Sequence, residues 1–205
     1  MTGTDEGRMR AEDAFREAEE RIAAWTPGRP LDLAIEGLER IPDSIGGLSK
    51  LTDLWFTGWD ETRRITVGGR GVSDLGPLAG LTALQSLDCS WTLVSDLGPL
   101  AGLTALQSLD CGWTLVSDLG PLAGLTALQR LDCDRTLVSD LGPLADLTAL
   151  QRLDCNLDFG VRPWSARWAH RSPEPQLRRD FGVRPWSARW AHRSPEPQLR
   201  RDFGV

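Results

Sequence analysis

The most constraining feature of the sequence is a repeat with a period of 22 residues. The string V-S-D-L-G-P-L-A-(G/D)-L-T-A-L-Q-(S/R)-L-D-C starts four times, at Val72, Val94, Val116 and Val138. Each copy ends in one of the four cysteines of the chain, namely Cys89, Cys111, Cys133 and Cys155. A near-identical repeat of this length indicates a stacked array, because each unit can bury its apolar residues only against its neighbours.

Each unit contains a pattern typical of a short strand. Leu87 and Cys89 are apolar and alternate with the polar residues Ser86, Asp88 and Ser90. This alternation predicts a strand with one face directed inward. The same positions recur in every copy, so we expect the structural core to contain Leu87, Cys89, Leu109, Cys111, Leu131, Cys133, Leu153 and Cys155.

The second half of each unit has a different period. Leu97, Leu100 and Leu103 recur every three residues, which predicts a tight helical turn on the opposite side of the coil from the strand. Three residues suit the start of this turn: Ser95, Asp96 and Pro99. The first two can cap exposed amides, and proline has no amide hydrogen to satisfy there.

The pattern L-x-x-L-x-C-x-x-T-x-V resembles the bacterial leucine-rich repeat, with Thr92, Thr114 and Thr136 where many relatives carry Asn. The 22-residue length and the D-L-x-P-L turn are similar to the internalin-type subclass. This resemblance implies an α/β solenoid with a curved, parallel concave β-sheet and short helical or 3-10 turns on the convex side. Residues 72–155 carry it most strongly.

Weaker copies of the repeat precede residue 72. Ile65 and Val67 lie 22 residues before Leu87 and Cys89, so we expect a degenerate repeat over 62–81 with a strand of its own. Apolar residues at 51, 54 and 56, and again from 31 to 51, indicate earlier units. The solenoid is therefore predicted to span 31–157, with about seven repeats.

The segment before the array has the pattern of an amphipathic helix. Between Ala11 and Trp25 the apolar residues share one face, with Glu and Arg opposite. The end of a solenoid exposes core residues, so residues 1–30 are predicted to form an N-terminal capping helix.

Parallel strands stack equivalent residues about 4.8 Å apart. We therefore expect ladders of outward side chains on the concave face. The partner-binding residues predicted there are Asp88, Asp110, Asp132, Asp154, Trp91, Trp113, Arg130, Arg152 and Asp134. Stacked carboxylates repel one another unless cations relieve them, and Arg130 and Arg152 can supply some relief. Trp and Arg are frequent at binding hot spots, so an acidic, partly aromatic patch predicts a basic protein partner.

Competing interpretations of the same residues remain open. The aspartates can recur simply because the unit was duplicated, with no selected partner. A calcium site is disfavoured, because each repeat offers one carboxylate at this place and lacks the G-G-x-G-x-D pattern of calcium-binding repeats. The cysteines occupy a leucine position and lack zinc spacing, so we expect buried, reduced residues and no metal.

No catalytic or cofactor-binding motif is present. The only histidines are His170 and His192, and no phosphate-binding glycine motif occurs. Gly68-Gly69-Arg70-Gly71 is better explained as a turn between repeats. No apolar run is long enough to span a membrane, and the polar N-terminus lacks a signal-peptide pattern. The sequence predicts a cytoplasmic protein that is not an enzyme and needs no cofactor.

Residues 158–205 carry a different pattern, two identical 22-residue units rich in Arg, Trp and Pro. Ten Arg against five acidic residues give this tail a net charge of +5 and leave −11 for the rest. With suitably chosen codons, T-L-V-S-D-L-G-P-L read one base later matches residues 163–170 at seven of eight positions. We therefore interpret the tail as frameshift-derived and weakly ordered. It would leave the last coil without a dedicated cap, which predicts self-association there.

The combined reading is a non-catalytic module that binds a protein partner on its concave face. One alternative is the repeat half of a larger bacterial signalling protein whose nucleotide-binding or other effector domain has been lost. Another is nucleic-acid binding through the Arg/Trp tail, which the acidic body disfavours.

Overall fold

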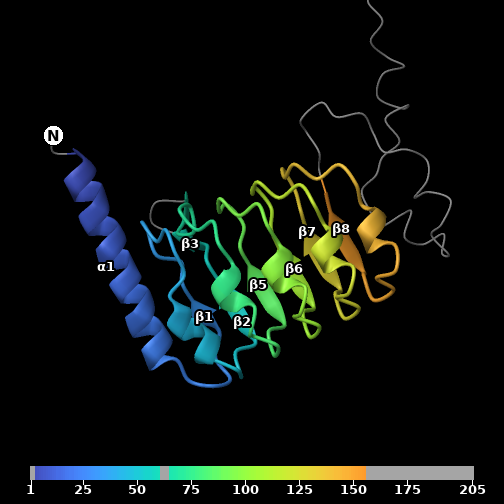
Figure 1. Cartoon of the computed structure of the whole chain (residues 1–205), viewed down its shortest axis with the longest axis horizontal. Helices are drawn as coiled ribbons and strands as arrows, with labels where there is room; N and C mark the ends of the chain where they lie inside the picture. Colours follow the sequence, from blue (N-terminus) through green and yellow to red (C-terminus); the bar gives the residue numbers. More distant parts are fainter. Residues whose placement is uncertain (1–2, 61–64, 156–205) are drawn as a thin grey trace, which may run out of the picture.

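The computed structural model describes residues 3–60 and 65–155, and it shows a helix followed by a row of stacked coils (Figure 1). The helix is α1 (Gly3–Ala24). The strands are β1 (Leu31–Asp32), β2 (Asp53–Trp55), β3 (Gly58–Asp60), β4 (Ile65–Val67), β5 (Ser86–Asp88), β6 (Ser108–Asp110), β7 (Arg130–Asp132) and β8 (Arg152–Asp154). Five 3-10 turns alternate with them: η1 (Asp43–Gly47), η2 (Gly76–Leu78), η3 (Gly98–Leu100), η4 (Gly120–Leu122) and η5 (Gly142–Leu144).

Six strands form one parallel sheet in the order β1-β2-β5-β6-β7-β8. In the regular coils the register is one whole repeat, so that Leu87 pairs with Leu109 and Leu109 pairs with Leu131. The sheet lines one side of the array and the 3-10 turns line the other (Figure 1). The described residues therefore form a leucine-rich repeat solenoid, as the sequence resemblance implied.

The turns η2 to η5 are capped as the sequence predicted for Asp96. The Oδ1 atom of Asp96 accepts a hydrogen bond of 2.7 Å from the amide of Gly98, the first residue of η3. The equivalent aspartates at 74, 118 and 140 do the same at 2.7–2.8 Å. Proline follows the glycine in each turn, where no amide hydrogen is needed. A cap of this kind ends each inter-repeat loop at a fixed place.

The core is a continuous column of leucine, valine and cysteine between the sheet and the turns. Leu87, Leu109 and Leu131 are at most 2% exposed, and Cys89, Cys111 and Cys133 are fully buried. Leu153 and Cys155, in the last described coil, are only partly buried. Burial thus decreases toward the C-terminal end of the described chain.

The threonines that replace the usual asparagine have a defined role. The buried Oγ1 atoms of Thr92, Thr114 and Thr136 donate to the carbonyl oxygens of Cys89, Cys111 and Cys133 at 2.6–2.7 Å. Each bond closes the chain over three residues as it leaves the strand, and it satisfies a polar group inside the core. The repeat therefore keeps its bend after the strand without asparagine.

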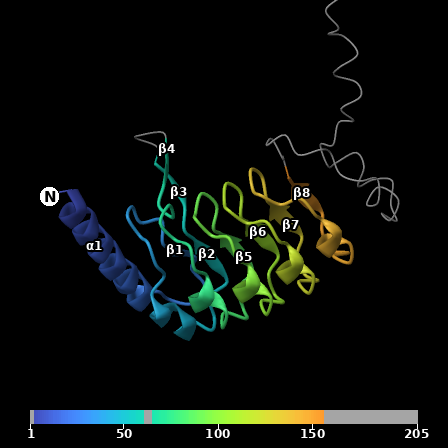
Figure 2. The same ribbon diagram turned by 45° about the horizontal axis from the view of Figure 1, so that its top comes forward.

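The prediction that Ile65 and Val67 form a strand of the main parallel sheet is wrong. Strand β4 pairs with β3 in an antiparallel hairpin, and Leu54 of β2 pairs directly with Leu87 of β5. The main sheet has six strands in the described residues, where the sequence indicated about seven repeats. Figure 2 shows the hairpin on the same side of the array as the loops that follow the regular strands.

Two glycines return the chain from the hairpin to the coil. Gly68 and Gly69 both have positive φ, +82° and +65°. A Cβ at Gly68 would lie 2.6 Å from Ala34 Cα and 2.6 Å from Phe56 O, so no side chain fits there. A turn is present at this place as predicted, but it leads from strand β4 of the hairpin back into the coil rather than from one repeat to the next.

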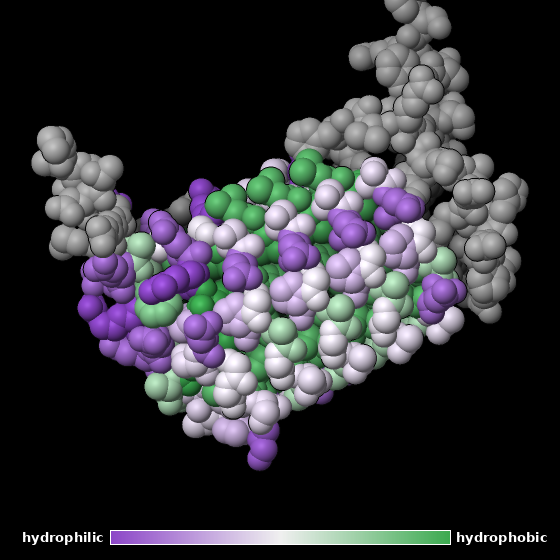
Figure 3. Space-filling model, viewed as in Figure 1, coloured by the Kyte–Doolittle hydropathy of each residue, from purple (hydrophilic) through white to green (hydrophobic). Residues whose placement is uncertain are grey.

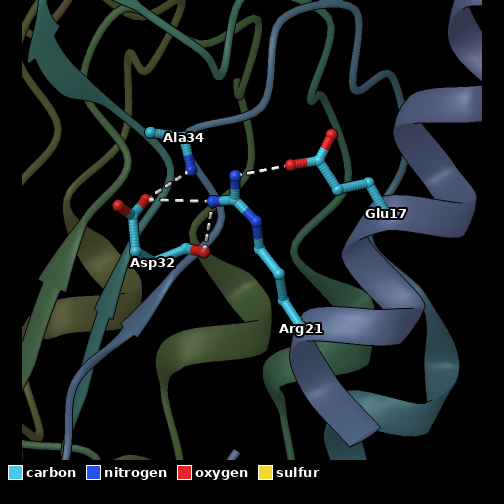
Figure 4. A network of polar contacts seen from close by, with 4 residues as sticks. All are labelled: Glu17, Arg21, Asp32 and Ala34. Carbon is cyan, nitrogen blue, oxygen red and sulfur yellow. Dashed lines mark hydrogen bonds and ion pairs between the residues drawn. The ribbon is translucent and has the colours of Figure 1, made fainter. Parts of the chain in front are cut away.

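Helix α1 packs against the first coil through one apolar face and an arginine. Ala18 and Ile22 are buried. Arg21 donates from Nη1 to the carbonyl of Asp32 at 3.0 Å and from Nη2 to Glu17 Oε1 at 2.5 Å (Figure 4). The Asp32 carboxylate in turn accepts from the amide of Ala34 at 2.8 Å. The helix starts at Gly3, within the predicted capping segment of residues 1–30 and before the amphipathic pattern that begins at Ala11, and it packs against the first coil at the end of the core.

The predictions for residues 158–205 lie outside the described residues. They concern the weakly ordered tail, its origin in a shifted reading frame and its binding of nucleic acid. The domain boundaries at 30/31 and 157/158 stay predictions as well.

Candidate recognition surface

The outward side chains of the sheet form in-register rows. Ser86, Ser108, Arg130 and Arg152 make one row, and Asp88, Asp110, Asp132 and Asp154 make the next. The residues between them in each strand, such as Leu109, point into the core. Trp55 of β2 pairs with Asp88 and is 39% exposed, so an aromatic side chain continues the aspartate row toward the N-terminal end.

The aspartate row also shapes the backbone. Oδ1 of Asp88, Asp110 and Asp132 accepts a hydrogen bond of 2.9–3.0 Å from the amide two residues further on. This is the Asx-turn, in which a side chain stands in for a backbone carbonyl. Sequence reasoning assigned these aspartates to binding alone and missed this function. The signal available was an aspartate at the end of every strand, followed by a change of direction.

Burial and mutual repulsion raise the pKa values in the middle of the row. The pKa of Asp110 is raised to about 6, mainly by loss of hydration and also by the charges of Asp88 and Asp132, against the lowering effect of the hydrogen bond from the Gly112 amide. Loss of hydration likewise raises the pKa of Asp132. Within the described residues, neither Arg130 nor Arg152 forms an ion pair with the row, so the predicted relief is not direct.

A second row lies just past the strands and contains two stacked tryptophans. The rings of Trp91 and Trp113 have centroids 4.2 Å apart and an interplanar angle of 10°. The Cζ atom of Arg135 lies over the Trp113 ring, 4.7 Å from its centroid. We call these three residues the tryptophan row. Trp91 and Trp113 are 37% and 45% exposed, so the stack presents apolar surface to solvent.

The backbone of the tryptophan row is left-handed. Trp91, Trp113 and Arg135 have φ values of 56°, 57° and 53°, a region that favours glycine. The amides of Trp91 and Trp113 nevertheless continue the inter-coil ladder, donating to Gly112 O and Asp134 O at 2.9 and 2.7 Å. These bonds hold each residue in register, and the rings therefore stack.

A row of leucines follows the tryptophan row and was not predicted as surface. Leu93, Leu115 and Leu137 are 51%, 48% and 56% exposed. Their amides donate to the carbonyls of Val72, Val94 and Val116 in the preceding coil. Figure 3 shows strongly hydrophobic residues along the upper margin of the coils, in line with such a row. The sequence pattern T-L-V could have indicated this exposure. Thr92 and Val94 are buried, so the leucine between them is directed outward.

An open pocket lies at the N-terminal end of the tryptophan row. It is lined by Thr57, Gly58, Thr66, Asp88, Ser90 and Trp91. Two of these residues come from the end of β2 and the start of β3, one from β4 and three from the β5 coil. The pocket therefore occupies the place where the hairpin interrupts the repeat.

Cys89, Cys111 and Cys133 are free thiols in the core, and Cys155 is a free thiol that is partly buried. Burial raises the pKa of Cys89 and of Cys111 well above the ordinary thiol value. Their Sγ atoms lie 3.4 and 3.3 Å from the carbonyl oxygens of Asp110 and Asp132 in the next coil. These features describe small apolar core residues rather than reactive ones.

Two further properties bear on the class of site. Among residues 3–60 and 65–155, no group of three or more His, Cys, Asp and Glu side chains is placed to hold a metal ion. No helix in that part of the chain combines the length and apolarity that a membrane span requires.

No protein-family model matches the chain, and no curated protein matches it significantly. Similar solved structures include two internalins of Listeria monocytogenes. Internalin inlF is 30% identical, with 55% of this chain and 30% of that chain covered and a TM-score of 0.47. Internalin C2 is 28% identical, with 63% and 57% covered and a TM-score of 0.48. The chain spans less than two thirds of either internalin, and the solenoid assignment above rests on the repeat register rather than on these matches.

Proposed function

We propose that this leucine-rich repeat protein recognises another protein through the aspartate row and the tryptophan row together. The observation that carries the proposal is the stacked, solvent-exposed pair Trp91 and Trp113 beside a row of carboxylates. Tryptophan is the residue type most enriched at binding hot spots. Strands β5 to β8 hold these side chains in register, so the surface is organised before a partner arrives, which lowers the ordering cost of binding.

Charge favours a partner with basic groups. The aspartate row contributes four carboxylates, and Asp134 adds another beside Asp132. Arg130 and Arg152 introduce positive charge only in β7 and β8. The surface is therefore acidic and aromatic over β5 and β6 and mixed in charge over β7 and β8. A partner that places basic and apolar groups over β5 and β6 would complement it.

The test starts from proteins retained by the tagged full chain and measures their Kd for matched variants. The Asp110→Asn variant keeps an Oδ1 acceptor for the Gly112 amide and removes the charge. Combined with Trp113→Ala, it is expected to weaken a genuine partner at least about tenfold, the effect of losing a hot-spot residue. The Asp146→Asn variant makes the same charge change at an exposed position beside η5 and should bind as the unchanged chain does.

Unchanged binding of every retained protein by the double variant would contradict the proposal. Thermal unfolding of the three proteins shows whether a loss of binding reflects the surface rather than the fold.

The proposal extends to a non-catalytic protein of the cytoplasm, and the free cysteines support a reducing compartment. Self-association is a further prediction for the C-terminal coil, where Leu150, Leu153 and Cys155 are partly buried. A lost effector domain and nucleic-acid binding stay predictions, and no observation on the described residues favours either.

A further inference from the structure

The pocket beside Trp91 has an aromatic wall. One face of the Trp91 ring stacks on Trp113 in the following coil. The pocket residues Thr57, Gly58 and Thr66 belong to the preceding coil and its hairpin, on the opposite side of Trp91 from Trp113. The ring face that Trp113 does not cover is therefore directed toward the pocket.

The interrupted repeat explains why this ring face is accessible. The register that pairs Leu54 with Leu87 places Gly58 at the position equivalent to Trp91. Gly58 has no side chain and belongs to β3, where the chain leaves the coil to form the hairpin. The row of stacked rings therefore ends at Trp91. The equivalent position in the preceding coil has no side chain, and the pocket lies there.

The pocket also contains a carboxylate with spare accepting capacity. Asp88 Oδ1 accepts from the amide and the hydroxyl of Ser90 at 2.9 and 2.7 Å. Its Oδ2 accepts from Thr57 Oγ1 at 3.0 Å. A carboxylate has about four lone-pair sites, so roughly one remains, on Oδ2. These three bonds fix the carboxylate in place at the pocket wall.

The far end of the tryptophan row shows which group suits such a ring face. There the guanidinium of Arg135 covers Trp113, with Cζ 4.7 Å from the ring centroid. A guanidinium is planar and stacks on an aromatic ring while its edge donates hydrogen bonds. Lysine lacks the plane, and a neutral aromatic group would cover Asp88 without pairing its charge.

We propose that the pocket binds an arginine side chain of the partner protein, with the guanidinium stacked on Trp91 and one N–H donating to Asp88 Oδ2. The inference rests on the proposed function and narrows it. The aspartate and tryptophan rows supply the wide surface, and the pocket supplies one position selective for arginine.

The experiment uses the full chain and three short peptides that avoid the need for an identified partner. They are acetyl-Gly-Arg-Gly-amide and its analogues with lysine or citrulline in place of arginine. Binding is followed by the NMR shifts of the Gly58 and Ser90 backbone amides, which line the pocket and remain in every variant. The arginine peptide is expected to bind about fivefold more tightly than the citrulline peptide, the size of an exposed cation–π contact. It is also expected to bind more tightly than the lysine peptide, because an ammonium has no plane to stack on the ring.

Two variants remove the contacts, and two serve as controls. Trp91→Ala and Asp88→Asn should each abolish most of the selectivity for arginine, and Asp88→Asn keeps the Oδ1 acceptor for Ser90. Leu115→Ala changes an exposed residue outside the pocket and should leave binding unchanged. Thr66→Arg places a guanidinium on the pocket wall and should block the peptide with Trp91 and Asp88 intact.

Equal binding of the three peptides, or unchanged selectivity in Trp91→Ala, would overturn the arginine pocket. That result is distinct from failure of the proposed function, which is decided by captured proteins and the Asp110→Asn, Trp113→Ala variant. A partner that depends on the rows, together with no peptide selectivity, removes only the pocket. Peptide selectivity without a row-dependent partner supports the pocket and removes the wider surface.

Discussion

The regular coils of residues 72–155 and the interrupted coil of residues 53–71 bury equivalent core residues, but the surfaces that they present to solvent differ. In the regular coils every outward position is repeated, so that side chains such as Trp91 and Trp113 cover one another. In the interrupted coil the hairpin β3–β4 replaces the repeated loop, and a pocket forms beside the last ring. The regular coils thus form rows of stacked side chains, and the interrupted coil leaves an open pocket beside Trp91.

The largest expected effect comes from Gly68, which returns the chain from the hairpin to the coil. Gly68→Ala puts a Cβ against Ala34 and Phe56 at a φ of +82°, so we expect a loss of about 3 kcal/mol in the free energy of unfolding. Gly80→Ala in a regular coil is the matched control, since a Cβ there meets nothing within 4 Å. It should change stability by less than about 0.5 kcal/mol. Urea unfolding measures both, and equal effects would mean that the hairpin tolerates a side chain at 68.

A smaller effect is expected from the buried hydroxyl of a regular coil. Thr114→Val removes the donor to the Cys111 carbonyl and should cost about 1–2 kcal/mol of unfolding free energy. Thr57→Val is the counterpart in the interrupted coil, where the hydroxyl bonds Asp88 and Ser90 near the pocket. We expect a smaller loss there, because those partners are closer to solvent. A larger loss for Thr57→Val in urea unfolding would reverse this ranking of the two regions.

The aspartate row predicts a dependence of stability on pH. The pKa of Asp110 is raised to about 6 in the folded chain, so between about pH 4 and 6 the folded state binds more protons than the unfolded state. Stability should therefore decrease as pH rises from 4 to 6, by about 1 kcal/mol from this group after solvent screening is discounted. Asp110→Asn should flatten that part of the profile. A wild-type profile that rises over the same range would contradict the raised pKa.

The smallest effect concerns the stack itself. Trp113→Leu removes the ring contact with Trp91 and should cost less than about 1 kcal/mol, the worth of an aromatic pair beyond its buried area. The near-ultraviolet circular dichroism of the stacked indoles should decrease at the same time. An unchanged spectrum would show that the rings do not couple in solution.

The fold was predictable because a period of 22 residues leaves a stacked array as the way to bury the repeated leucines. The hairpin was not, because Ile65 and Val67 have the spacing and the apolar character of a rung. Two features make residues 65–67 part of a hairpin rather than a strand of the main sheet: the pairing of Leu54 with Leu87 and the two glycines with positive φ. The spacing of residues in the sequence reveals neither feature.

The candidate site was predictable only as a set of ladder positions. In-register strands place Trp91 beside Trp113 as soon as the period is known. The Asx-turns at Asp88 and Asp110, and the pocket beyond Trp91, depend on local backbone geometry after the strand. The sequence alone does not distinguish an aspartate that binds a partner from one that accepts a hydrogen bond from its own backbone.

The left-handed backbone of the tryptophan row couples the length of the array to its internal cost. Each of Trp91, Trp113 and Arg135 holds a conformation that costs a residue with a side chain about 1–2 kcal/mol. A chain that gained another such 22-residue unit by duplication would add one side chain to the row and one more strained residue with it. Glycine at the same position would relax each coil and leave no ring to stack. Each unit added to this surface therefore carries its own strain, which the burial of that unit's leucines has to outweigh.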